Sequence, residues 1–301
     1  MQERTERKAV LTGMTFAIVV GFAFLANKAA LTGGGLYDVL TYRFLFALLV
    51  LPVVLKISKL SLRIAKKDIP AMLMLCATYL LFLHFQLIGL LTCSTVVGAV
   101  FFATAPVFIA VIAVPLLGEH LDKVQIACIL AGALAVILMI MKGEGAREMT
   151  AAGAMWLALS TLLSATHSTL TRYHRGKFQP LVITGWIIVI GTVYFSVLLL
   201  IDHCSAGNMR GFFAPLADPA FLLSSVYLGI GCILVSSATI NYTFRILPAA
   251  KAGIFNNIST VISILAGGLI LHEPLTIVHI VCAAVVITAA IIINGRKDQL
   301  T

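Results

Sequence analysis

Long apolar stretches separated by short polar connections constrain the fold of this chain more than any other feature. The hydrocarbon core of a bilayer is about 30 Å thick and needs roughly 20 apolar residues for each helical span. Membrane β-strands would instead alternate apolar and polar residues. The sequence therefore predicts an all-α integral membrane protein with ten transmembrane helices. We place them at 10–31, 36–56, 69–90, 94–117, 123–141, 152–171, 181–201, 219–240, 249–271 and 275–293.

The composition agrees with a chain that is embedded in lipid. Charged residues make up 11% of the 301 positions and hydrophobic residues 60%, whereas a soluble domain carries roughly a quarter charged residues. A net charge of +9 would suggest a nucleic-acid partner in a soluble protein. Here the basic residues gather between the apolar stretches, so we expect the lipid bilayer as partner and no nucleic acid.

The distribution of basic residues also predicts the orientation. With a cytoplasmic N-terminus, sixteen Lys and Arg fall on the cytoplasmic side and three on the other, while Lys28 and Arg43 lie within spans. Basic residues concentrate in cytoplasmic connections, so both termini are predicted to be cytoplasmic, which requires an even number of spans. We expect a multi-pass protein of the cell inner (plasma) membrane.

The two halves of the chain resemble each other. Residues 94–101 can be laid on 249–255 so that Gly98 matches Gly253, and Glu119 matches Glu273 with one residue dropped between. A repeat of five helices is odd, so the second copy must insert upside down relative to the first. Inverted repeats are common in secondary transporters, which bind substrate near the midplane at the repeat interface. We divide the chain into repeats at 1–146 and 147–301.

These residues resemble the EamA-type exporters of the drug/metabolite transporter superfamily, over nearly the whole chain. The resemblance is carried by Arg43-Phe44, the run from Gly89 through Pro106 to Glu119, and Leu271-His272-Glu273-Pro274-Leu275. It implies a ten-helix secondary transporter of small metabolites that works by alternating access. The resemblance implies no cofactor.

Two features depart from the pattern of these exporters. Val20-Gly21 stands where an aromatic-glycine pair is often found. The second half has no proline that matches Pro106. Because proline removes a backbone hydrogen bond and can bend a helix, we expect the helix at 249–271 to be less bent than the one at 94–117. A gating role for the bend at Pro106 is a hypothesis.

Ionisable and strongly polar side chains inside spans are the candidates for a substrate site, because they cost several kcal/mol when they face lipid. Lys28 and Arg43 are predicted to face each other near the outer ends of the first two spans. They could attract a carboxylate or phosphate, arginine through its planar fork. The alternative is snorkelling to the interface, or an Arg43 that caps backbone carbonyls.

Other candidates lie on four further spans. Tyr79 and His84 cannot both share one narrow face with Gln86, and His84 could equally be a structural histidine. Adjacent helical residues point about 100° apart, so at most one of two neighbouring asparagines lines a cavity. Phe102 and Trp156 could stack on a ligand or pack in the core. The predicted substrate-binding set is Lys28, Arg43, Tyr79, His84, Phe102, Trp156, Asn256 and Asn257.

Several other polar residues have structural explanations. We interpret His167 and Asn241 as ties between helices. Glu119 and Glu273 precede helices, where a carboxylate is stabilised by the helix dipole. Because no Asp or Glu lies in the middle of a span, a relay of protons between carboxylates is not predicted.

The sequence favours a transporter over an enzyme or a receptor. His272-Glu273 is followed by a histidine at 279, too late for the zinc-binding pattern H-E-x-x-H, and the phosphate-binding G-x-x-x-x-G-K-[ST] pattern is absent. We therefore predict no metal and no catalytic residues. A receptor would need larger loops. A zwitterionic amino acid is the preferred substrate, with amines, quaternary ammonium compounds, nucleosides and phosphorylated metabolites as alternatives. A homodimer also remains open, because internal and dimer-forming helix faces look alike.

Overall fold

The computed structural model describes residues 2–117, 123–142, 150–174, 176–205, 209–246, 249–273 and 276–297. These residues form helices and connections without a β-strand. Many large apolar side chains on the outside are exposed, Ile277 at 80% and Leu49 at 73%, as expected of a surface that contacts lipid. Five stretches are long and apolar enough to cross a membrane: Arg7–Gly33, Leu36–Ser58, Lys66–Thr92, Pro180–Ser205 and Pro219–Ile240.

Helices lie in each of the ten predicted ranges. The first half contains α1 (Gln2–Gly21), α2 (Ala23–Gly33), α3 (Leu36–Ser58), the 3-10 turn η1 (Lys66–Asp68), α4 (Ile69–Thr92), α5 (Thr95–Ala103), α6 (Ala105–Leu117) and α7 (Lys123–Lys142). The second half contains α8 (Ala151–Tyr173), α9 (Pro180–Ser205), the 3-10 helix η3 (Met209–Ala217), α10 (Pro219–Val226), the π-helix η4 (Tyr227–Val235), α11 (Ser236–Ile246), α12 (Ala249–Ile270) and α13 (Ile277–Lys297).

Three of the predicted ranges are interrupted. The range 94–117 breaks at Thr104, between α5 and α6, whereas α12 is continuous. This difference lies in the direction that the missing proline predicts. The break at Phe22 and the π-helix η4 were not predicted. A π-helix inside an α-helical span often marks a functional site. The helices that pack against η4 are therefore candidates for such a site.

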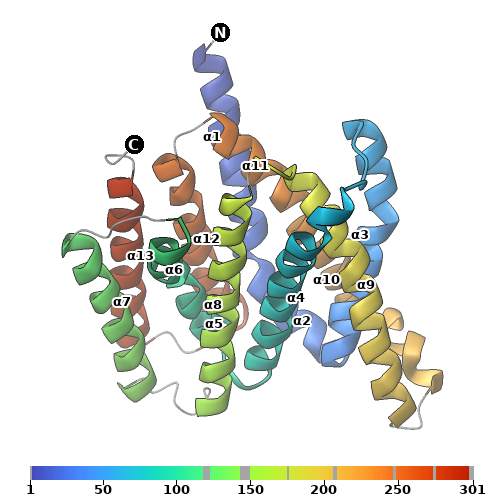
Figure 1. Ribbon diagram of the computed structural model, residues 1–301. Coiled ribbons are helices and arrows are strands. Elements are labelled where there is room, and N and C mark those ends of the chain that lie inside the picture. The colour runs from blue at the N-terminus through green and yellow to red at the C-terminus, as the bar shows by residue number, and fades with distance from the viewer. Residues whose placement is uncertain are drawn as a thin grey trace.

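The chain runs back and forth between two faces of a helical bundle. Figure 1 shows that α1 begins and α13 ends at the same face, which we call the terminal face. The α2–α3, α4–α5 and α12–α13 connections lie at the other end, which we call the opposite face. The shared face of the first and last helices agrees with the even number of spans that the sequence predicts.

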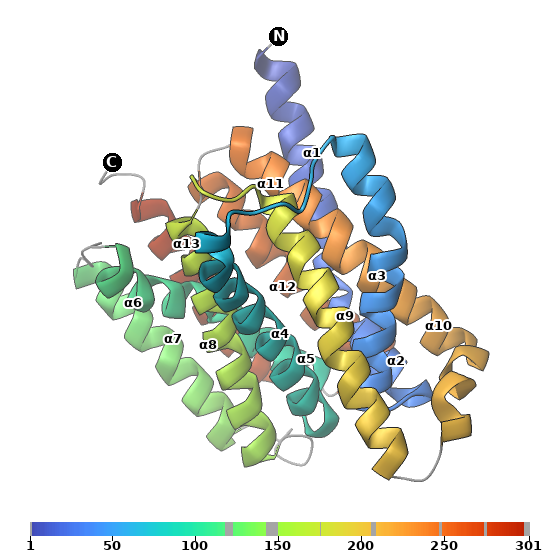
Figure 2. The same ribbon diagram turned by 45° about the vertical axis from the view of Figure 1, so that its right-hand side comes forward.

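Helix packing repeats between the two halves. The contact of α4 with α8 has its counterpart in α2 with α10, and that of α1 with α12 in α6 with α8. The pairs α3–α9, α5–α12 and α7–α13 each join corresponding helices of the two halves. Figure 2 shows α3 and α9 side by side. The pattern is that of two similar units that pack against each other through corresponding helices.

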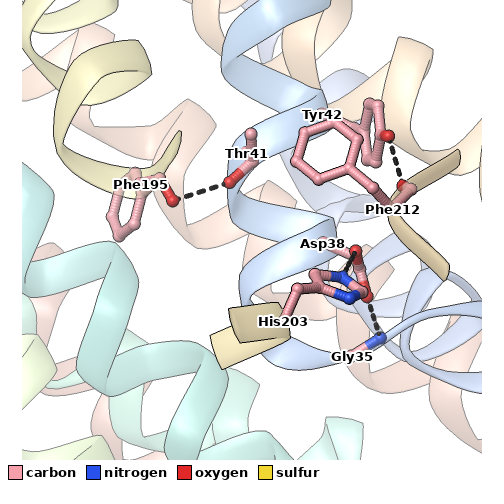
Figure 3. A network of polar contacts seen from close by, with 7 residues as sticks. All are labelled: Gly35, Asp38, Thr41, Tyr42, Phe195, His203 and Phe212. Carbon is pink, nitrogen blue, oxygen red and sulfur yellow. Dashed lines mark hydrogen bonds and ion pairs between the residues drawn. The ribbon is translucent and has the colours of Figure 1, made fainter. Parts of the chain in front are cut away.

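Two aromatic side chains at corresponding positions of the two halves make corresponding hydrogen bonds. Tyr42, the seventh residue of α3, donates its hydroxyl to the carbonyl of Phe212 in η3, the connection that follows α9, at 2.6 Å (Figure 3). Trp186, the seventh residue of α9, donates Nε1–H to the carbonyl of Leu62 in the connection that follows α3, at 2.9 Å. Each helix of the pair thus anchors the connection that follows its partner.

Candidate functional site

A polar cavity lies in the half of the bundle nearest the terminal face, where α8 ends and α9 begins. Its volume is about 110 Å³, close to that of a cavity that holds one benzene molecule, about 150 Å³, and well below a drug-sized site. The cavity therefore accepts a small group in this conformation. It is lined by Tyr79, His167, Thr171, Pro180, Ile183, Thr184, Ile187, Ile233, Ser237 and Ile240.

Tyr79 connects this cavity to a row of aromatic rings. Its ring makes a T-shaped contact with His167 at 5.1 Å between centroids and with Phe82 at 5.7 Å. Phe82 in turn stacks on Phe102 at 6.1 Å. Tyr79, a member of the predicted set, thus lines the cavity. Phe102, another member, is separated from Tyr79 by Phe82.

Arg43 is a buried charge that interacts with a residue of the cavity lining. It is the eighth residue of α3, about 11 Å along the helix axis from the opposite-face end, and therefore near the middle of a 30 Å bilayer core. Only 3% of its surface is exposed, and its guanidinium interacts electrostatically with Tyr79 and Cys232. The Arg43 Nε atom has no hydrogen-bond partner among the described residues.

The only hydrogen bond recorded for Arg43 in the described part of the chain is weak. Its Nη1 donates to Oδ1 of Asn27 over 3.4 Å, at the long end of the range for such bonds. Asn27 itself is 2% exposed. A buried charge is normally paired and fully hydrogen-bonded, so the arrangement leaves this guanidinium able to bind an anionic group.

Lys28 does not face Arg43 as predicted. Its neighbour Asn27 contacts the guanidinium instead, and Lys28 is half-buried near Cys93 in the α4–α5 connection. The physical reason is helical geometry, since adjacent residues point about 100° apart. Asn27 was missed, although an asparagine within an apolar stretch is the same kind of signal that drew attention to Lys28.

His84 and Trp156 lie in a second aromatic cluster on another side of α4. The Tyr194 hydroxyl is 3.4 Å from Nδ1 of His84, and Tyr37 makes a T-shaped contact with its ring at 5.7 Å. Trp156 stacks on Phe85 at 5.0 Å, with 14° between the planes. These two predicted residues do not line the cavity.

Other predicted residues lie partly outside the described structure. The side chains of Pro106, Asn241, Asn256 and Asn257 are among these, although their backbones belong to α6, α11 and α12. Pro106 is the second residue of α6, where proline is compatible with a helix. Glu119 lies outside the described residues.

Glu273 closes the bundle at the opposite face. Its two carboxylate oxygens accept hydrogen bonds from the backbone N–H groups of Thr95, at 2.7 Å, and Val96, at 2.9 Å. The expected role as a helix cap is therefore present, but the capped helix is α5 in the other half of the chain. We call these two contacts the Glu273 latch.

A second contact group at the opposite face joins α3 to α9. Asp38 accepts a hydrogen bond from Gly35 N at 2.8 Å and lies 3.5 Å from Nε2 of His203. One turn further along α3, the Thr41 hydroxyl donates to the carbonyl of Phe195 at 2.9 Å. Figure 3 shows these residues gathered where α3 meets the end of α9. Together with the Glu273 latch, they hold the opposite face closed.

An ion pair beside the cavity joins α4 to the α8–α9 connection at the terminal face. Lys177 Nζ, in the α8–α9 connection, lies 2.8 Å from Oδ1 of Asp68 at the start of α4. Burial, together with the charge of Lys177, lowers the pKa of His174, an effect that Asp68 opposes. The neutral form of His174 is thus favoured where α8 ends.

We expect Glu273→Gln to loosen the opposite face, because the substitution removes the charge and one of the two acceptor oxygens. A helix cap is worth about 1 kcal/mol, or roughly fivefold in an opening equilibrium. Cys93, 1% exposed beside α5, should then react about fivefold faster with a membrane-impermeant thiol reagent. Peptide-resolved mass spectrometry in a Cys204→Ser background measures this rate, since Cys204 is exposed. An unchanged rate would show that packing alone closes this face.

Comparisons with known proteins agree with this architecture. The model of the EamA-like transporter family matches residues 7–141 and again 151–295. The chain is 31% identical to "Uncharacterized transporter YcxC" of Bacillus subtilis, over 100% of this chain and 97% of the relative. It is 25% identical to the "WAT1-related protein At3g02690, chloroplastic" of Arabidopsis thaliana, over 68% of this chain and 50% of that protein.

A solved crystal structure has the same fold, with a TM-score of 0.66 and 16% identity over 97% of this chain and 98% of that one. The double match of the family model covers most of the chain, and the Bacillus subtilis relative, which is matched over 97% of its length, is a transporter by name. The chain is therefore a multi-pass membrane transporter that belongs to the EamA-like transporter family.

Proposed function

We propose that this protein is a secondary transporter of amino acids or related zwitterions in the inner membrane, and that it works by alternating access. The observation that carries the proposal is the Arg43 guanidinium, buried at mid-depth in the bundle with one long hydrogen bond. It neighbours Tyr79, which lines the polar cavity. Resemblance to exporters supports export as the net direction.

The proposed architecture is ten spans in two inverted five-helix repeats, with both termini in the cytoplasm. It is supported by the matched helix contacts of the two halves and by the reciprocal bonds of Tyr42 and Trp186. The excess of Lys and Arg on the terminal-face side supports the cytoplasmic placement of that face. Inverted repeats give a carrier two gates, one at each face, that can open in turn.

The conformation described above corresponds, in this proposal, to a carrier closed to the outside. The opposite face is held by the Glu273 latch and by the contacts of Asp38. The cavity lies in the other half, beside the ends of α8 and α9. Substrate would therefore reach Arg43 from the cytoplasmic side in this state.

The chemistry of the site favours a carboxylate on a small molecule. Arginine presents a planar fork of donors that matches a carboxylate in two parallel hydrogen bonds. An amine without an acidic group would gain nothing from Arg43 and would be repelled by its charge. The small cavity volume, about 110 Å³, favours a metabolite over a drug-sized solute.

Counterflow into proteoliposomes tests the proposal. Vesicles that contain the purified protein are loaded with one unlabelled solute, and entry of the same labelled solute is followed. The panel contains neutral amino acids, amines, nucleosides and sugar phosphates. We expect entry of one or more amino acids above that in protein-free vesicles. Exchange of amines, nucleosides or sugar phosphates, without any amino acid, would overturn the proposal.

A further inference from the structure

We propose that His167 Nε2 accepts a hydrogen bond from the protonated amino group of the substrate, while Arg43 binds its carboxylate. The inference rests on the proposed function and names a residue that the sequence indicated only as a tie between helices. It divides the site into a donor part at Arg43 and an acceptor part in the cavity. Tyr79 makes a ring contact with His167 and interacts electrostatically with Arg43.

The contacts of His167 determine which ring nitrogen carries the proton. Nδ1 lies 3.0 Å from the carbonyl oxygen of Leu75. A carbonyl only accepts hydrogen bonds, so Nδ1 must be the donor. The Thr78 hydroxyl, 3.5 Å from Nδ1, lies 3.0 Å from the carbonyls of both Met74 and Leu75. The hydrogen bond from His167 to α4 is therefore made by Nδ1, and Nε2 takes no part in it.

This assignment leaves Nε2 as an acceptor in the neutral ring. No carboxylate of the described residues forms an ion pair with His167, and burying an unpaired charge is costly, so the neutral form is favoured. The partner recorded for Nε2 is the Thr171 hydroxyl, one turn along α8, at 3.5 Å. A bond this long is weak, and His167 and Thr171 both line the cavity.

A second acceptor lines the same cavity. The Thr184 hydroxyl donates its proton to the carbonyl of Pro180 at 3.1 Å, which leaves its oxygen lone pairs available to accept. None of the residues that line the cavity is acidic or permanently charged. Neutral acceptors among apolar side chains, in a cavity linked to the Arg43 guanidinium through Tyr79, suit an ammonium group that enters together with its own carboxylate, because the zwitterion brings no net charge into the bundle.

Two substitutions separate the tie from the proposed ligand contact. In His167→Asn the side-chain amide reaches the position of Nδ1, so the bond to Leu75 is kept and the Nε2 acceptor is lost. In His167→Gln the longer side chain reaches the position of Nε2, so an acceptor is kept and the tie is lost. The two variants therefore have opposite predicted effects on stability and on selectivity.

The experiment compares an amino acid with its deaminated analogue, the same carboxylic acid without the amino group. Both compete in counterflow of the amino acid that the wild-type protein exchanges. A hydrogen bond to a charged group changes affinity by about 10- to 100-fold. We expect the wild-type protein and His167→Gln to prefer the amino acid by such a factor. His167→Asn should lose this preference while it binds the deaminated acid as the wild-type protein does.

The possible outcomes are distinct. A His167→Asn protein that still prefers the amino acid overturns this inference and leaves the proposed function intact. A wild-type protein that exchanges no amino acid overturns the proposed function, and this inference with it. If His167→Asn does not fold, His167→Gln decides, because loss of the preference in a variant that keeps the acceptor would also contradict the proposal.

Discussion

Replacing Arg43 by methionine is expected to weaken the apparent affinity for substrate about 100-fold without weakening the fold. Arg43 is 3% exposed, its Nε has no partner among the described residues, and its bond to Asn27 is 3.4 Å long. Replacing a buried ion pair by apolar residues of similar volume is often neutral or stabilising by about 1–4 kcal/mol, and we expect a gain of the same sign when a poorly paired buried charge gives way to an apolar side chain of similar length. The loss of Asn27's partner works against this gain, so the melting temperature should stay the same or rise.

The transport defect should be large. Two hydrogen bonds from arginine to a carboxylate are worth at least about 3 kcal/mol, which corresponds to roughly 100-fold in apparent affinity. Melting in detergent and counterflow in vesicles measure the two quantities on the same preparation. Arg43→Lys is the matched control, because it keeps the charge but not the fork, and we expect partial activity. A destabilised Arg43→Met protein with normal exchange would identify Arg43 as purely structural.

Adding one methyl group at Gly229 is expected to separate α3 from η4 and to remove both stability and transport. A Cβ at this position would collide with the backbone carbonyl oxygen of Arg43 and lie 3.2 Å from the backbone nitrogen of Ala47. Neither atom belongs to a flexible side chain, so one of the helices must move. Overpacking of this kind costs about 1–3 kcal/mol, and it displaces the residue proposed to bind the substrate.

Gly231 provides the control within the same π-helix. A Cβ there would meet side-chain atoms of Tyr227 and Val19 no closer than 3.5 Å, which is ordinary packing. Gly231→Ala should therefore be neutral, or more stable by up to about 1 kcal/mol because alanine is less flexible than glycine. The two melting temperatures and the two counterflow rates are compared directly. Equal behaviour of the variants would contradict the close approach of α3 and η4.

The positions of the helices were predictable because the bilayer imposes a length and an apolar character on every span. The range 94–117 is divided into α5 and α6, whereas α12 is a continuous helix. This difference was predictable from Pro106, which has no counterpart in the second half. The break at Phe22 and the π-helix η4 were not predictable. Neither has a proline, and each depends on contacts with other helices that a single sequence does not display.

The candidate site was predictable in its chemistry more than in its geometry. A charge or an aromatic hydroxyl within a span is visible in the sequence, and Arg43 and Tyr79 do lie together. The separation of Lys28 and His84 from them depends on the rotation of each helix, which helix packing decides. The partner of Glu273 was also beyond prediction, because its carboxylate caps a helix 178 residues away along the chain.

Ligand-induced stabilisation of the purified protein is the most direct test of the central claim, that Arg43 is the anchor for the substrate carboxylate. A ligand at 100 times its Kd stabilises the folded state by about 2.7 kcal/mol. We predict this shift for the exchanged amino acid with the wild-type protein. At the same concentration, which is then about the Kd of the variant, Arg43→Met should shift by only about 0.4 kcal/mol. An equal shift in both proteins would contradict the claim, because the carboxylate would then be bound elsewhere.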